Sequence, residues 1–122
     1  MSQHFFEFNH NGKECLLMSG WDKGPQMAYI VIGYYMQDKS DWEEPFILDT
    51  DIPFDRIANI VHLDEIIIHF KGILERLEIS VPGALFDGVA KDIRENNSNL
   101  MYLYNIQGEQ QKISENPFVS QI

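Results

Sequence analysis

The chain has 122 residues, and with 44% hydrophobic and 12% aromatic residues it can build the packed core of one ordinary domain. Nine Lys and Arg against nineteen Asp and Glu give a formal net charge of -10 at pH 7. This charge disfavours sequence-independent binding to nucleic acid or to an anionic membrane, because phosphate groups would be repelled. A basic protein partner is the more natural complement, although acidity also serves solubility alone.

Cysteine usage and hydropathy indicate the compartment. Cys15 is the one cysteine, so no disulfide can form within the chain and a reducing compartment is expected. The opening segment, MSQHFFEF, lacks the basic and then apolar order of a signal peptide. The longest apolar run, residues 28–36, is far shorter than the roughly 20 residues that span a bilayer. We therefore expect a cytoplasmic protein that forms one domain, residues 1–122, with a loose tail at residues 114–122.

The first half of the chain predicts four strands in hairpin order, at residues 5–9, 13–19, 26–36 and 45–48. The clearest local signal is Asn11-Gly12, because this dipeptide tolerates the positive φ angles of a tight hairpin turn. Successive strands joined by short turns pair antiparallel. The first half therefore predicts an antiparallel sheet.

The second half changes from a two-residue to a helical period. Apolar residues three and four apart predict a helix at residues 62–77 and a second at residues 82–96. The second helix runs into an asparagine-rich segment, and asparagine tolerates the left-handed conformation that ends many helices. A fifth strand is predicted at residues 100–106, and a short return through residues 112–113 is a sixth candidate.

This order predicts an α+β fold, in which two helices pack on one face of an antiparallel sheet. Strand neighbours alternate between faces, so the five tyrosines cannot all lie under the helices. We therefore expect a tyrosine-bearing sheet face that is exposed or binds a partner, which includes a second copy of the chain. These tyrosines are Tyr29, Tyr34, Tyr35, Tyr102 and Tyr104.

The hairpin order predicts two loop clusters at opposite ends of the sheet. One is an acidic patch around an indole, made of Asp38, Asp41, Trp42, Glu43 and Glu44. The other brings Trp21 and Asp22 close to Asp49 and Asp51, at the exit of the fourth strand. Trp21 either closes the end of the core or anchors a binding surface, since tryptophan is common in both places.

Carboxylates and amides in the chain do not match a known metal loop. The segment Asp49-Thr50-Asp51 alternates like a calcium loop but lacks the following glycine and the distal glutamate. Asp92 and Asn96 project near the apolar face of the second helix, where they must find hydrogen bonds. They either fasten the next loop or contact a ligand.

The sequence contains no glycine-rich phosphate loop, serine elbow or cysteine pair. We therefore predict no catalytic residue, no metal and no cofactor. The leading hypothesis is a small acidic module that docks on a basic protein, as an inhibitor, an immunity-type or an anti-defence protein would. One alternative is a metal-dependent hydrolase that uses Asp22, Asp49 and Asp51. A second alternative is a scaffold that self-associates as a homodimer through its exposed sheet face.

Overall fold

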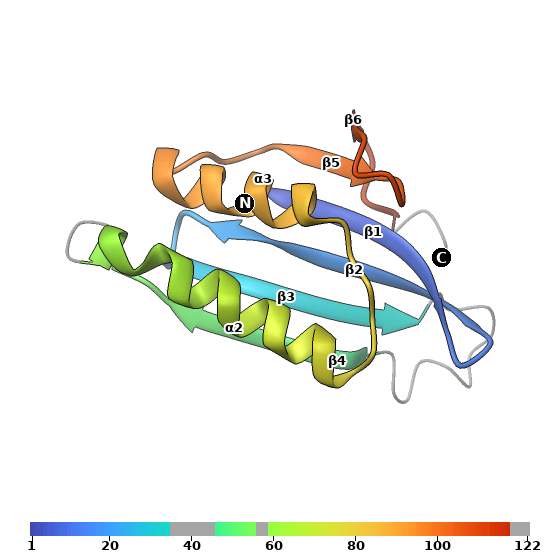
Figure 1. The fold of residues 1–122 in the computed structure, drawn as a ribbon. Coiled ribbons are helices and arrows are strands. Elements are labelled where there is room, and N and C mark those ends of the chain that lie inside the picture. The colour runs from blue at the N-terminus through green and yellow to red at the C-terminus, as the bar shows by residue number, and fades with distance from the viewer. Residues whose placement is uncertain (35–45, 56–58, 118–122) are drawn as a thin grey trace.

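Six strands and two long helices form the described part of the chain, which is residues 1–34, 46–55 and 59–117 of a computed structural model (Figure 1). Only the backbone is described for residues 46–49. The strands are β1 (Gln3–His10), β2 (Lys13–Asp22), β3 (Met27–Tyr34), β4 (Phe46–Pro53), β5 (Met101–Tyr104) and β6 (Gln110–Lys112). The helices are α2 (Leu63–Arg76), preceded by the 3-10 turn η2 (Ile60–His62), and α3 (Gly83–Glu95). The predicted α+β class is confirmed.

The strands form one mixed sheet in the order β4-β3-β2-β1-β5-β6. Four of the five neighbouring pairs are antiparallel, whereas β5 runs parallel to β1 and pairs with its residues Gln3–Phe6. The prediction of a purely antiparallel sheet is therefore wrong. The reason is the path of α3, which returns the chain to the end of the sheet where β1 begins (Figure 1). From there β5 can extend along the free edge of β1 only in the same direction.

The turn between β1 and β2 is the predicted tight hairpin. Asn11 and Gly12 have φ angles of 53° and 82°, as the Asn-Gly dipeptide indicated. The side-chain oxygen of Asn9 also accepts a hydrogen bond from the Gly12 N–H at 3.0 Å. The register Phe8↔Cys15 and Phe6↔Leu17 that follows from this turn places apolar residues of both strands on one face.

Strand β4 is longer than the predicted strand at residues 45–48. Thr50 and Asp51 belong to β4, where they pair with Ile30 and Tyr29, and Asp49 pairs with Val31 in backbone register. Thr50 and Ile52 pair with the core residues Ile30 and Ala28, and Ile52 packs against the core, so the alternation of a strand continues through this segment. The segment is therefore a strand, and its interpretation as a loop at the exit of the fourth strand is wrong.

Both helices lie on one face of the sheet and bury the predicted stripes (Figure 1). Their bounds differ by one residue at each end from the predicted ranges 62–77 and 82–96. The buried apolar residues are Leu63, Ile66, Ile67, Phe70 and Leu74 in α2 and Leu85, Phe86, Val89, Ala90 and Ile93 in α3. This three-and-four spacing is what a helix needs in order to cover a sheet with one side.

The two helices end differently. Helix α3 ends at Asn96, whose left-handed conformation (φ 55°, ψ 42°) confirms the role predicted for asparagine. Helix α2 ends in a Schellman motif, in which the Ile79 N–H donates to the Leu74 carbonyl at 2.9 Å. The left-handed residue of that motif is Glu78 (φ 58°), at a position that favours glycine. A side chain with a Cβ costs about 1 kcal/mol there relative to glycine.

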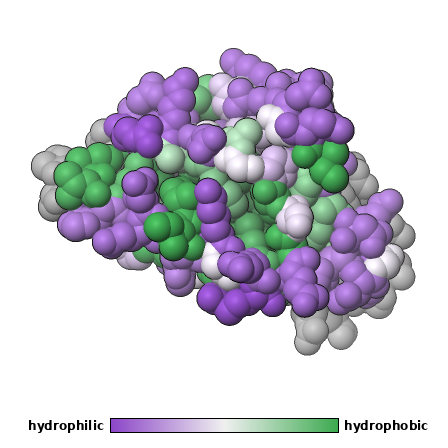
Figure 2. All heavy atoms as spheres, viewed as in Figure 1, coloured by the Kyte–Doolittle hydropathy of each residue, from purple (hydrophilic) through white to green (hydrophobic). Residues whose placement is uncertain are grey.

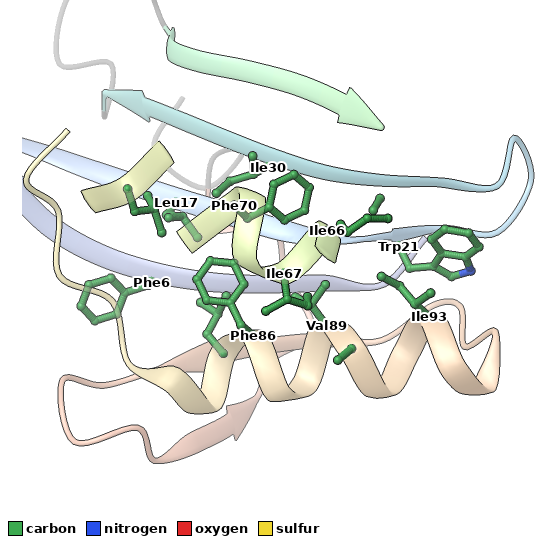
Figure 3. Close-up of a cluster of buried hydrophobic side chains, with 14 of the residues drawn as sticks. Phe6, Leu17, Trp21, Ile30, Ile66, Ile67, Phe70, Phe86, Val89 and Ile93 are labelled. Carbon is green, nitrogen blue, oxygen red and sulfur yellow. The ribbon is translucent and has the colours of Figure 1, made fainter. Parts of the chain in front are cut away.

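The main core lies between the helices and the sheet (Figure 3). Phe6, Leu17 and Ile30 from the sheet meet Phe70 and Phe86 from the helices, and all five side chains are at most 5% exposed. Burial of such a side chain stabilises the fold by about 1.5–3 kcal/mol. Figure 2, viewed from the helix side, shows hydrophobic residues at the surface between hydrophilic ones.

The described tyrosines do not form an exposed sheet face. Tyr102 and Tyr104 pair with His4 and Phe6 on the helix side, whereas Tyr29 lies on the opposite face. Tyr29 and Tyr104 are each only 4% exposed. Tyr35 lies outside the described residues. The expectation of a tyrosine-bearing docking face is therefore wrong for Tyr29, Tyr102 and Tyr104, and these residues do not support a homodimer.

The segment after β5 turns back to form β6, which confirms the sixth strand. Past β6, the Ile113 N–H donates to the Met101 carbonyl at 3.0 Å. The predicted tail at residues 114–122 lies partly outside the described residues, which end at residue 117. No helix in the described ranges is long and apolar enough to cross a membrane.

Candidate functional site

Trp21, a predicted binding residue, closes one end of the core. Its side chain is fully buried on the helix side of β2, and its ring meets the ring of Phe54 edge to face at 6.4 Å (Figure 3). The indole N–H donates to the side-chain oxygen of Asn96 at 2.9 Å. This hydrogen bond satisfies the polar end of the indole inside the fold. Of its two predicted roles Trp21 therefore has the structural one, and the surface-anchor role is wrong.

Asp22 and Asp51 lie on the other face of the sheet, around Tyr29. Burial raises the pKa of Tyr29, and the negative charges of Asp22, Asp92 and Asp51 raise it further. The phenol donates a hydrogen bond to the Ser2 carbonyl. Asp22 and Asp51 thus both act on Tyr29 from this face, whereas Trp21 points to the opposite face.

The acidic residues predicted from the sequence do not form a metal site in the part of the chain whose side chains the structure describes. Among the residues whose side chains are described, no group of three or more His, Cys, Asp or Glu converges on one point. The side chain of Asp49 is outside that set. The acidic patch of Asp38, Asp41, Trp42, Glu43 and Glu44 is also outside the described residues, so its role stays a prediction.

A polar network that the sequence did not reveal links β1, α3 and β5 inside the fold. His4 is 1% exposed, and its Nε2 hydrogen-bonds to the carboxylate of Asp92, which is 2% exposed. His4 Nδ1 lies 2.7 Å from the Tyr104 hydroxyl. An ionised carboxylate can only accept, so Nε2 carries the hydrogen in this pair. The first strand is thus fastened to a helix and to a strand near the other end of the chain.

The remaining groups of this network are also paired. Asn97 donates its side-chain N–H to the second Asp92 oxygen at 3.0 Å, and Gln110 donates to the Tyr104 hydroxyl at 2.8 Å. Gly88 in α3 leaves room for the network, because a Cβ there would lie 2.7 Å from His4 Cε1. The interpretation of Asp92 as a residue that fastens the next loop is confirmed through Asn97.

The network resembles a carboxylate–histidine–hydroxyl relay, but its burial gives it a structural role. A relay that performs chemistry must reach its substrate within hydrogen-bond distance. His4, Asp92 and Tyr104 are at most 4% exposed. Burial raises the pKa of Tyr104 to about 12, so its hydroxyl keeps its proton near neutral pH. The arrangement therefore holds elements together.

The network predicts a specific loss of stability in acid. Burial alone would raise the pKa of Asp92, but hydrogen bonds from His4 and Asn97 outweigh it and the net pKa is lowered. Asp92 thus stabilises the fold above its unfolded pKa of about 3.9, and this contribution is lost as pH falls through the lower folded pKa. Denaturant unfolding should show that the stability difference between wild type and Asp92→Asn narrows as the pH falls below about pH 4. The exposed Asp64→Asn should show no comparable narrowing, and a constant Asp92→Asn difference at all pH values would contradict the assignment.

Two hollows flank the segment Glu78–Ser80 that joins α2 to α3. The first, which we call the edge hollow, has a volume of about 560 Å³ and is lined by Phe6–Asn9 of β1, Glu78–Ser80 and Leu103–Ile106. The second, the interhelical hollow, has a volume of about 580 Å³. Its lining residues are Lys71, Leu74, Glu75, Glu78, Ile79, Ser80, Val81, Gly83 and Phe86. Both volumes are in the range of ligand-binding sites.

The edge hollow combines an apolar floor with an acidic rim. Phe6, Ile79 and Tyr104 are nearly buried around it, and Ile106 is 78% exposed at its border. Glu7 and Glu78 on the lining are both exposed. An apolar side chain beside a cation would fit these two kinds of surface at once.

Sequence reasoning missed His4 and Glu78, for different reasons. The alternation His4, Phe6, Phe8 could have placed His4 on the core face of the first strand. Asp92 on the inner face of the second helix was its natural partner, but sequence alone could not place the two side by side. The left-handed conformation of Glu78 could not be predicted from the sequence, because glycine is the residue that usually marks such a position at the end of a helix.

Comparison with known proteins adds no family to this description. No protein-family model matches the chain, and neither a curated protein nor a solved structure matches it.

Proposed function

We propose that the protein is an acidic binding module that docks on a basic surface of another protein. The observation that carries the proposal is the edge hollow, where an apolar floor lies beside exposed Glu7 and Glu78 in a chain of net charge -10. Opposite charges steer two proteins together and fix their register, while apolar contacts hold them. The module would act by covering the partner's surface, in the manner of an inhibitor, an immunity-type or an anti-defence protein.

The distribution of polar groups supports binding over chemistry. The network His4–Asp92–Tyr104 is buried; Tyr104 also lines the edge hollow, but its hydroxyl is paired with His4 and Gln110. Exposed carboxylates lie on the surface instead, and two of the residues that carry them, Glu7 and Glu78, are among those that line the edge hollow. Acidic residues of this kind act through their field and through contacts with cations.

Affinity capture tests the proposal. The immobilised protein is incubated with an extract of its source cells at about 0.05 M salt. Retained proteins are released with salt and identified by mass spectrometry. Each of them is then purified and tested for direct binding. We expect at least one direct partner of positive net charge that salt releases. Direct partners that are no more basic than the extract as a whole, or that salt does not release, would refute the proposed function.

A further inference from the structure

The second half of β1 has a free edge in the described structure. Strand β1 continues to His10, but its pairing with β5 stops at Phe6. The chain leaves β5 at Asn105, whose side-chain oxygen accepts the N–H groups of Gln107 and Glu109 and fixes a turn. Among the described residues, Glu7–His10 therefore have strand neighbours only on the β2 side.

This free edge is a template for one more strand. Four strand residues span about 13 Å, and alternate residues direct their N–H and C=O groups to the open side. The edge hollow lies along it, so a chain paired with Glu7–His10 would have apolar Phe6 and Phe8 beside it on the helix side. Glu7 lies on the opposite face, because strand residues alternate.

Carboxylates border this edge from two elements. Glu7 comes from β1 and Glu78 from the link after α2, and both line the edge hollow. Glu78 keeps a left-handed backbone that glycine would adopt without strain. The carboxylate of Glu78 is thus present at a position where the fold itself would favour no side chain.

We propose that the edge hollow and the free edge of β1 bind an extended, basic segment of the partner protein. The segment adds a strand beside Glu7–His10 and inserts apolar side chains into the edge hollow on the helix side. It places Lys or Arg next to Glu7 on the opposite face of the sheet and next to Glu78 beside the hollow. This mode joins main-chain hydrogen bonds, which give affinity, to side-chain pockets, which give specificity. The inference rests on the proposed function, because it names the surface and the partner chemistry of that same binding.

A peptide probe tests the site. A short blocked peptide in which arginine and leucine alternate is titrated into the labelled protein, and backbone amide shifts are followed by NMR. We expect saturable shifts in residues 7–10, 78–80 and 103–106, and slower hydrogen exchange of the outward amides of residues 7–10. A peptide in which glutamate replaces arginine is expected not to bind.

Variants at Glu78 separate the side chain from the fold. Glu78→Gln is expected to weaken peptide binding about threefold. Glu78→Gly should weaken peptide binding by the same factor, but it should also raise the melting temperature by about 3–5 °C. Glu95→Gln removes the same charge from the far end of α3, where it is exposed, and should leave the affinity within about 1.5-fold. A weaker affinity in a more stable variant cannot come from loss of folding.

Other outcomes overturn the site and remain separable from the proposed function. Shifts that map to another surface, or equal binding of the glutamate peptide, would reject this site while a captured basic partner would still uphold the proposed function. Absence of peptide binding would reject the strand-addition site in the same way. If the shifts of residues 7–10 depend on protein concentration without peptide, the edge binds a second copy of the chain. If residues 118–122 contact the edge, it binds the chain's own end.

Discussion

Replacement of His4 by alanine is expected to lower the free energy of unfolding by about 3–5 kcal/mol. The change removes the hydrogen bond that His4 donates to Asp92, a carboxylate that is 2% exposed, and leaves this buried charge with the side chains of Asn97 and Ser2 as its described partners. It also empties the space between Tyr102 and α3, because the His4 ring stacks on Tyr102 at 5.5 Å. Urea unfolding followed by circular dichroism measures the loss.

A matched histidine provides the control for this prediction. His62 lies 3.4 Å from Glu65 in a pair whose side chains are 56% and 76% exposed. Exposed pairs contribute little because water screens them, so His62→Ala should change stability by no more than about 0.5 kcal/mol. Equal effects of the two substitutions would show that burial of the His4–Asp92 pair does not govern its contribution.

Substitution of Gly20 by alanine should destabilise the fold by about 3 kcal/mol, at the upper end of the range for overpacking. A Cβ at this position in β2 would collide with the Ser2 carbonyl oxygen and lie 2.9 Å from both the Ser2 carbonyl carbon and the Tyr29 hydroxyl. Ser2 cannot easily retreat, because its N–H donates to the Trp21 carbonyl at 2.8 Å and its hydroxyl accepts from the Trp21 N–H at 3.1 Å. The melting temperature should therefore fall by more than about 6 °C.

Gly83 is the control glycine. It begins α3, and a Cβ there would have no neighbour within 4 Å. Gly83→Ala should be neutral or stabilise the fold by up to about 1 kcal/mol, because alanine restricts the unfolded chain. If Gly20→Ala were as well tolerated as Gly83→Ala, the close approach of the first residues to β2 would be wrong.

The sequence correctly predicted those elements that depend on residues only a few positions apart. The Asn11-Gly12 turn, the helical stripes and the asparagine at the end of α3 each depend on short-range geometry, and the structure has all three. The sequence also identified Trp21 as either a core residue or an anchor, but burial decides between the two and burial depends on the whole fold.

Elements that depend on long-range arrangement were not predictable. The parallel pairing of β5 with β1 follows from where α3 ends in space, and no local pattern records it. Likewise the residues of the edge hollow come from three segments far apart in the chain, β1, the α2–α3 link and the end of β5. The continuation of β4 through Thr50 and Asp51 was missed because aspartate is uncommon in strands and resembles a loop residue.

The dissociation constant of the captured direct partner, measured against salt concentration, tests the central claim most directly. If an acidic surface docks on a basic one, the constant should rise at least about tenfold between about 0.05 M and about 0.5 M salt, and the association rate should fall over the same range. An affinity and an association rate that do not change over this range would contradict electrostatic docking as the function of this protein.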